Sequence, residues 1–200
     1  TGINQTITLA TGESSKTVNI TVHGDDRDEM AEQETFTVNL SSPSAGAVIQ
    51  SGQGAKTVTI NDNDAAPSIT INNVSVAPRT TGAGANGTFT ISLTRGSEKT
   101  ITINFTNNPG RSPDISGTVT SATVPTHYTM ALPTPQTPNP LTLQPDQRQA
   151  TITFHANPIG GTPTSRHFYI RLTSATNATI SDQYGDARIC PNNMSSCSAP

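Results

Sequence analysis

Apolar and polar residues alternate in short runs along most of this chain. Alternation with a period of two is typical of β-strands that bury one face. No window places apolar residues at i, i+3, i+4 and i+7 over three helical turns, so the pattern predicts an all-β fold. In the N-terminal third, the predicted strands are residues 7–9, 18–22, 36–40 and 57–60.

A second series of predicted strands begins after Pro67. Residues 65–67 are predicted to be a linker, because proline interrupts strand pairing and biases the preceding residue to an extended backbone conformation. Residues 109–145 contain eight prolines, which indicates a long inserted connection rather than a central strand. The predicted strands of this series are residues 69–71, 74–76, 89–93, 101–105, 141–143, 152–154, 168–172 and a short strand at 189.

An internal repeat relates the two series. Residues 15–23 are echoed by residues 149–155, Phe36 by Phe168 and Val58 by Ile189. The first series therefore corresponds to the second half of the later one. Since a β-sandwich module needs about seven strands and about 100 residues, we expect the first module to lack its opening strands. The predicted domains are residues 1–64 (the C-terminal half of a module), 65–67 (linker), 68–193 (a second, degenerate module with the Pro-rich insertion 109–145) and 194–200 (tail).

Carboxylates are concentrated in the loop between the predicted strands 18–22 and 36–40. Six of the ten residues 25–34 are Asp or Glu, although only 12% of the whole chain is charged. A second acidic pair, Asp62 and Asp64, follows the last strand of the first module. The carboxylates of such clusters repel one another unless water or a cation neutralises their charge, and Ca²⁺ binds carboxylate oxygens readily. The alternatives are a calcium site and a solvated acidic surface.

The charge distribution and motifs exclude several classes of protein. Residues 1–66 carry a net charge of −6 and the remainder +3, and the bases of the second part are scattered, which argues against a nucleic-acid groove. No apolar run approaches the roughly 18 residues that span a bilayer, so no membrane insertion is expected. The four histidines are dispersed and no catalytic motif occurs, so we expect no enzyme.

Two cysteines, Cys190 and Cys197, lie near the C-terminus. Their spacing matches no zinc motif, and two thiols are too few for a structural zinc site. A disulfide in an oxidising compartment is favoured over two free thiols, and it would fix the tail rather than hold the fold.

Four segments of the first module carry a recognisable pattern: Asp25-Asp26, Glu34-Thr-Phe-Thr-Val-Asn-Leu40, Gly46-Ala47-Val-Ile49 and Thr57-Val-Thr-Ile-Asn-Asp-Asn-Asp64. They resemble the Calx-beta family, whose repeats occur in sodium–calcium exchangers and in extracellular and bacterial surface proteins. The resemblance is close over residues 1–64 and looser over 67–193. It implies tandem immunoglobulin-like antiparallel β-sandwiches with calcium at one end of a module.

The resemblance also implies a set of calcium ligands. The family places a glutamate at the position of Ala31, so either Glu29 or Glu32 must substitute for it. Ligands from the opening strands are missing with those strands. The second module has neutral residues at the corresponding positions, so calcium is expected in the first module alone. The implied metal ligands are Asp25, Asp26, Glu29 or Glu32, Asp62 and Asp64.

These features predict a non-enzymatic structural or adhesive segment of a larger secreted or cell-surface protein, in which calcium rigidifies the tandem. Thr1 is expected to begin a processed chain or a fragment. The expected partners are other protein domains or subunits. One alternative is a homopolymeric fibre or sheath, assembled by strand complementation of the incomplete first module. Another is an accessory binding domain of a secreted enzyme.

Overall fold

The computed structural model describes residues 2–77, 84–131, 139–158, 164–191, 197–198 and 200. All regular elements within these residues are β-strands, and no helix in them is long and apolar enough to cross a membrane. The all-β prediction is confirmed. The strands are β1 (Gln33–Asn39), β2 (Ala55–Asn61), β3 (Ser68–Ile71), β4 (Val74–Val76), β5 (Ala85–Leu93), β6 (Ile101–Pro109), β7 (Thr120–Ser121), β8 (Tyr128–Ala131), β9 (Leu141–Leu143), β10 (Gln149–Ala156), β11 (Arg166–Thr176), β12 (Thr179–Ile180) and β13 (Tyr184–Ile189).

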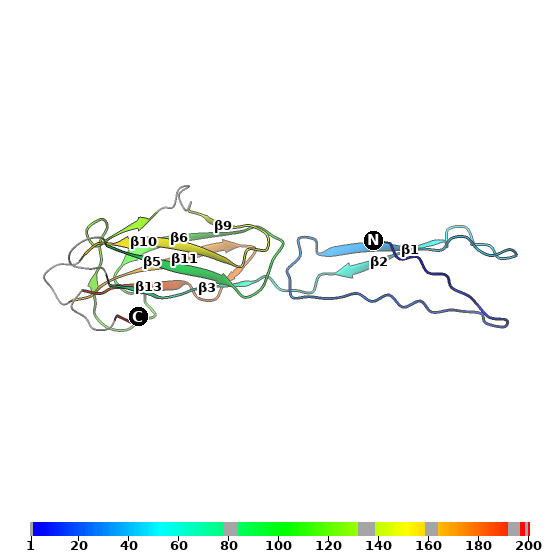
Figure 1. Ribbon diagram of the computed structural model, residues 1–200, viewed down its shortest axis with the longest axis horizontal. Helices are drawn as coiled ribbons and strands as arrows, with labels where there is room; N and C mark the ends of the chain where they lie inside the picture. Colours follow the sequence, from blue (N-terminus) through cyan, green and yellow to red (C-terminus); the bar gives the residue numbers. More distant parts are fainter. Residues whose placement is uncertain (1, 78–83, 132–138, 159–163, 192–196, 199) are drawn as a thin grey trace.

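The second module is a sandwich of two sheets (Figure 1). One sheet has the strand order β12-β3-β5-β10-β8, and the other has the order β4-β13-β11-β6-β9 with β7 beside β11. The central pairs are antiparallel, whereas β12 pairs with β3, β4 with β13 and β7 with β11 in parallel. The sheets are therefore mixed at their margins.

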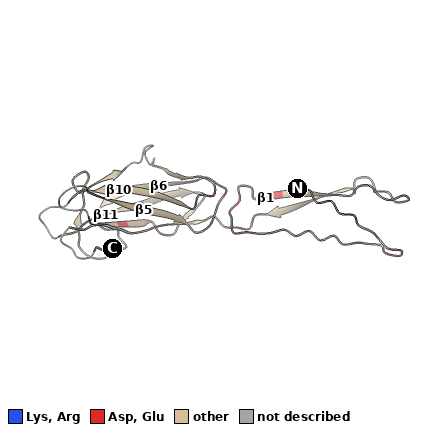
Figure 2. Cartoon of the chain, in the orientation of Figure 1, with Lys and Arg blue, Asp and Glu red and all other residues tan. Residues whose placement is uncertain are grey.

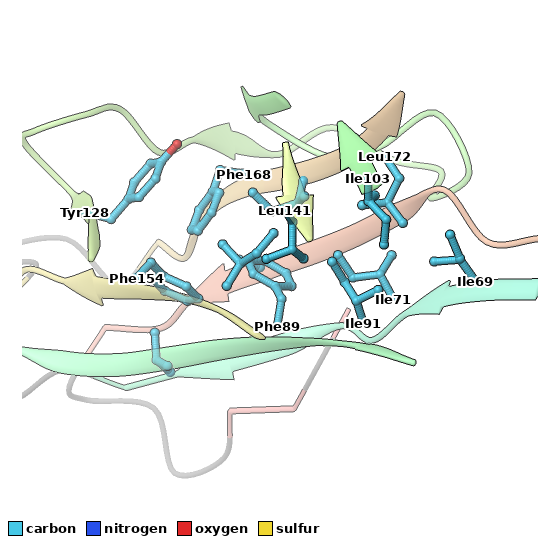
Figure 3. Close-up of a cluster of buried hydrophobic side chains, with 14 of the residues drawn as sticks. Ile69, Ile71, Phe89, Ile91, Ile103, Tyr128, Leu141, Phe154, Phe168 and Leu172 are labelled. Carbon is cyan, nitrogen blue, oxygen red and sulfur yellow. The ribbon is translucent and has the colours of Figure 1, made fainter. Parts of the chain in front are cut away.

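The sandwich core consists of the apolar side chains that alternate along the central strands, as the sequence pattern predicts. Phe89, Phe154 and Phe168 are fully buried between the sheets, with Tyr128 beside them (Figure 3). The rings of Phe154 and Phe168 meet edge to face at 4.9 Å, and Tyr128 stacks on Phe168 at 3.8 Å between ring centroids. Such aromatic pairs add stability beyond the area that they bury.

Gly87 makes room for one of these rings. It lies directly opposite Phe154 in the pairing of β5 with β10, and a Cβ atom at Gly87 would overlap the phenyl ring. Glycine is needed at this position because the Phe154 side chain occupies the space that any other side chain would fill.

The first module forms a separate two-stranded sheet of β1 and β2, in which Phe36 pairs with Val58. The predicted strands at 7–9 and 18–22 are wrong as regular elements, because neither belongs to a sheet. A strand needs a partner: in the second module β10, the counterpart of 15–23, pairs with β5 and β8. The described residues of the first module offer no such strands, and Ile20 remains 48% exposed.

The strand register corrects the proposed internal repeat. Phe36 pairs with Val58 in the first module, and its counterpart Phe168 pairs with Ala187 in the second. Val58 therefore corresponds to Ala187 rather than to Ile189. Apolar residues recur at every second position of an alternating strand, so a comparison of the sequences cannot detect a shift of two residues.

The Pro-rich insertion 109–145 contributes strands only to the margins of the sheets. β8 and β9 each end their sheet, and β7 lies beside β11 outside the main strand order. This placement suits a proline-rich segment, since proline cannot donate to a sheet ladder. Pro133, Pro135 and Pro138 lie outside the described residues. Beyond β13, Cys190 and Cys197 form a disulfide that closes the short C-terminal loop.

Candidate metal centre

The acidic loop, residues 25–32, lies at the end of the first module that meets the second. Figure 2 shows charged residues gathered at this junction. The loop contacts residues 95–99, the turn between β5 and β6, through a parallel bridge between Asp28 and Ser97. Sequence segments about 70 residues apart therefore form one polar region.

Three carboxylates converge in this region. One oxygen each from Glu29, Asp62 and Asp64 lies within 4.8 Å of the others, and all three residues are partly buried. Asp62 organises the group, because its two oxygens accept hydrogen bonds from the backbone N–H of Glu29 at 3.2 Å and of Asp64 at 2.8 Å. Among the described residues, no other group of three potential metal ligands lies so close together.

The pKa values show that these carboxylates are crowded. A side-chain hydrogen bond to Asp62, with burial and the charges of Asp62 and Asp25, raises the pKa of Glu29 to about 7. The pKa of Asp62 is lowered, first by the backbone N–H of Asp64 and then by Glu29. One proton is therefore shared between two carboxylates near neutral pH. A divalent cation would replace it, and hard carboxylate oxygens are the ligands that Ca²⁺ prefers.

The other predicted ligands have different neighbours. Asp25 accepts a hydrogen bond from the N–H of Arg27 at 3.0 Å, and its negative charge contributes to the raised pKa of Glu29. Asp26, 72% exposed in its side chain, lies 3.8 Å from Arg148. Glu32, 80% exposed, lies 3.4 Å from Lys99. The structure thus brings Glu29, and not Glu32, to the two aspartates.

Sequence reasoning missed Asp28, the one acid of the loop that is buried, at 3% exposure. Its carboxylate accepts hydrogen bonds from Ser97 Oγ at 2.9 Å and Lys99 Nζ at 2.8 Å. Its backbone also donates to the carbonyl of Gly96 and accepts from the N–H of Glu98. Asp28 is the largest cause of the raised pKa of Lys99. No local pattern could reveal this role, because the partners are about 70 positions away.

A further set of ion pairs joins the two modules around Asp28. Arg27 lies 3.3 Å from Glu98 and 2.5 Å from Asp146, and Arg95 lies 3.6 Å from Asp64. Asp64 therefore belongs both to the carboxylate group and to the contact with the second module. A cation bound at Asp64 would act directly at the inter-module surface.

The comparison with known families agrees with the sequence resemblance over residues 1–64. The profile of the Calx-beta domain matches residues 1–64. Among solved structures, CBD12 from CALX1.2 is similar at 9% identity and a TM-score of 0.44, with 62% of this chain covering 45% of that one. The apo-form Calx CBD1 domain is similar at 10% identity and a TM-score of 0.42, with 64% of this chain covering 98% of that one. The chain thus spans less than half of CBD12. No curated protein matches in sequence.

Proposed function

We propose that residues 1–64, which the profile of the Calx-beta domain matches, bind Ca²⁺ through Glu29, Asp62 and Asp64. The observation that supports this is the convergence of the three carboxylates from the acidic loop and the end of β2. In this proposal the chain is a non-enzymatic structural or adhesive segment of a larger secreted or cell-surface protein. The disulfide between Cys190 and Cys197 suits an oxidising compartment.

Calcium in this position would stiffen the junction between the modules. Glu29 lies in the loop that Asp28 attaches to the second module, while Asp62 and Asp64 stand immediately before the linker 65–67. A cation shared by these carboxylates would remove their repulsion and tie the linker's first residues to the loop. The linker would then have fewer conformations, and the second module a more nearly fixed orientation.

Thermal unfolding in EDTA and in millimolar Ca²⁺ tests the proposed site. Ca²⁺ is expected to raise the midpoint, since a ligand at 100 times its Kd stabilises by about 2.7 kcal/mol. The double variant Glu29→Gln/Asp62→Asn should bind Ca²⁺ at least tenfold more weakly. Glu32→Gln is the matched control, because it removes one charge from the same loop outside the carboxylate group, and it should keep the rise. An unchanged midpoint in the wild type would rule out the site.

Strand complementation is a second candidate function, supported by the open edge of β1. In the second module β11, the counterpart of β1, is paired on both sides, by β6 and β13, whereas β1 is paired by β2 alone. Apolar side chains elsewhere in the first module, such as Leu9 and Val22, are about half exposed. Strands from another subunit would cover the open edge of β1 and these apolar side chains, and could build a homopolymeric fibre. Multi-angle light scattering tests this: a monomer at every concentration excludes self-assembly.

A further inference from the structure

The outer face of the six-stranded sheet carries a polar group of side chains that calcium binding does not involve. Phe168 points into the core, so its neighbour His167 points to the opposite face, where it pairs across the strands with Arg188. The connection between β6 and β7 returns over this face. Its two ends are fixed by Gly110 and Ala122, whose N–H groups both donate to the carbonyl of His167, at 2.8 and 2.7 Å.

A pocket of about 360 Å³ opens beside this connection. Its charged members come from three segments: Arg111 follows β6, His167 belongs to β11 and Arg188 to β13. The lining is otherwise rich in hydroxyl groups, including those of Thr118, Thr120 and Ser165. None of the lining residues that the structure describes is acidic.

One acid that acts on His167 through its charge, Asp186, already has hydrogen-bond partners. Asp186 is buried, and its carboxylate accepts hydrogen bonds from the backbone N–H of Ser112 at 2.9 Å and from the Ser112 hydroxyl at 2.6 Å. The Asp186 carboxylate thus holds the connection onto the sheet. The guanidinium groups of Arg111 and Arg188 both line the pocket, and the Nε of Arg188 donates to Ser165 Oγ at 3.1 Å.

Two nitrogen atoms at the pocket lack hydrogen-bond partners. His167 is only 4% exposed, yet its Nδ1 has no partner among the described residues, and the same holds for the buried Nε of Arg111. Arg111 uses one terminal nitrogen for the carbonyl of Ser116 at 2.9 Å, which orients its guanidinium group. Buried polar atoms without partners are uncommon and indicate a place for water or an ion.

We propose that this pocket binds a small oxyanion between Arg111 and Arg188, with nearby hydroxyl groups as further donors. Guanidinium groups donate paired N–H bonds in a geometry that matches carboxylate, sulfate and phosphate oxygens. The ligand would be the acidic group of a larger molecule or a free anion. Binding requires no calcium, because the residues belong to the second module and lie apart from the carboxylate group.

The local field supports this assignment. Burial, followed by the charges of Arg111 and Arg188, lowers the pKa of His167 to about 4. The imidazole is therefore neutral at pH 7, and it can sit beside two arginines without adding a third positive charge. An anion in the pocket would oppose these charges and raise the pKa of His167, which provides a direct readout of binding.

The test is a titration of the calcium-free chain with sulfate, phosphate or acetate at pH 7 and constant ionic strength, followed through the imidazole NMR signals of His167. Saturable shifts are expected. Tighter binding of sulfate and phosphate than of acetate would identify the ligand as a tetrahedral anion. Tighter binding of acetate would identify it as a carboxylate. Shifts that stay linear and equal for all three anions, or no shifts, would overturn the proposal.

Variants distinguish specific binding of an anion in the pocket from non-specific attraction to positive charge. Arg111→Gln should weaken binding at least tenfold, and Arg188→Gln provides a second test if the first variant unfolds. Arg171→Gln is the matched control: Arg171 is exposed on the same face of β11, about 13 Å along the strand from His167. It should leave binding unchanged. Equal weakening by Arg111→Gln and Arg171→Gln would contradict a specific site.

Discussion

Asp28 and Glu29 are adjacent in the chain, yet their carboxylates meet different partners. Asp28 is buried against Ser97 and Lys99 of the second module, whereas Glu29 faces Asp62 and Asp64 of the first. An acid-rich stretch can thus combine two functions, because successive side chains point in different directions. Substituting one acid therefore tests the junction, and substituting its neighbour tests the metal site.

Asp28→Asn is expected to loosen the junction without touching the carboxylate group. The ammonium group of Lys99 would lose its buried counter-charge, and a hydrogen bond to a charged group contributes about 1.5–3 kcal/mol. The amide of Glu98, which donates to the Asp28 carbonyl, should then exchange with solvent about tenfold faster or more. Glu32→Gln, an exposed acid near the same lysine, should change this rate little. Equal rates in both variants would mean that Asp28 does not hold the loop.

His167 predicts a pH dependence of stability. Its folded pKa of about 4 lies below the value of about 6.5 in an unfolded chain, with Arg111, Arg188 and Asp186 as its charged neighbours. The unfolded state therefore gains the proton first, and stability is lost as pH falls from 6.5 toward 4. The loss is about 3 kcal/mol between pH 7 and pH 4.

The measurement is chemical denaturation of the wild type and of His167→Gln across this range, in chloride buffers. The variant should lose less stability on acidification, so the two curves should converge at low pH. Parallel curves would show that His167 titrates normally in the folded protein.

At the scale of the elements, the packing where β5 pairs with β10 depends on a glycine, Gly87. Gly87→Ala is expected to destabilise the second module by about 1–3 kcal/mol, because a Cβ would overlap the buried ring of Phe154. Gly24→Ala is a suitable control, since a Cβ there meets nothing within 4 Å. Thermal unfolding of both variants measures the difference. A Gly87→Ala protein as stable as the control would mean that Phe154 can move without cost.

The sequence pattern predicted strands well where partners exist. Phe89, Ile91 and Leu93 alternate along β5 as expected, and these residues are buried. Val18, Ile20 and Val22 alternate in the same way, but they form no strand. Alternation reports which face of a strand could be buried, whereas pairing depends on a distant segment that periodicity does not reveal. The two-residue strands β7 and β12 are too short to give any periodic signal.

The candidate sites show the same limit. Asp62 and Asp64 were predicted, with Glu29 and Glu32 as alternatives, because acids are dense in these two segments of the sequence. Arg111 and Arg188 could not, since the bases of the second part are scattered in sequence and only the sheet brings them together. Local composition identifies sites formed by one or two segments, and folding decides the rest.

At the scale of the whole molecule, the unequal charge of the two parts becomes an attraction between them. Among the described residues, six ion pairs join the first module to the second. They are Arg27–Glu98, Arg27–Asp146, Arg95–Asp64, Lys99–Asp28, Lys99–Glu32 and Arg148–Asp26. In four of them the acid belongs to the first module and the base to the second. The acidic and mildly basic parts therefore have complementary surfaces.

Salt should weaken this attraction in the calcium-free chain. Raising NaCl from about 0.05 to about 1 M shortens the screening length to about 3 Å, so the exposed pairs lose most of their energy. Small-angle scattering should then show a broader range of inter-module orientations. The buried Asp28–Lys99 pair should persist, and the Glu98 amide should stay protected. Identical scattering at both salt concentrations would show that the surface pairs do not orient the modules.

The burial of Asp28 has a consequence for any row of such modules. The acidic loop of one module is held in place by a turn of the module that follows it. In such a row the acidic loop of each repeat is held by the repeat that follows it. We expect a row built on this plan to have a direction, with repeats that are alike in sequence yet differ in rigidity at its last position, where no successor stands.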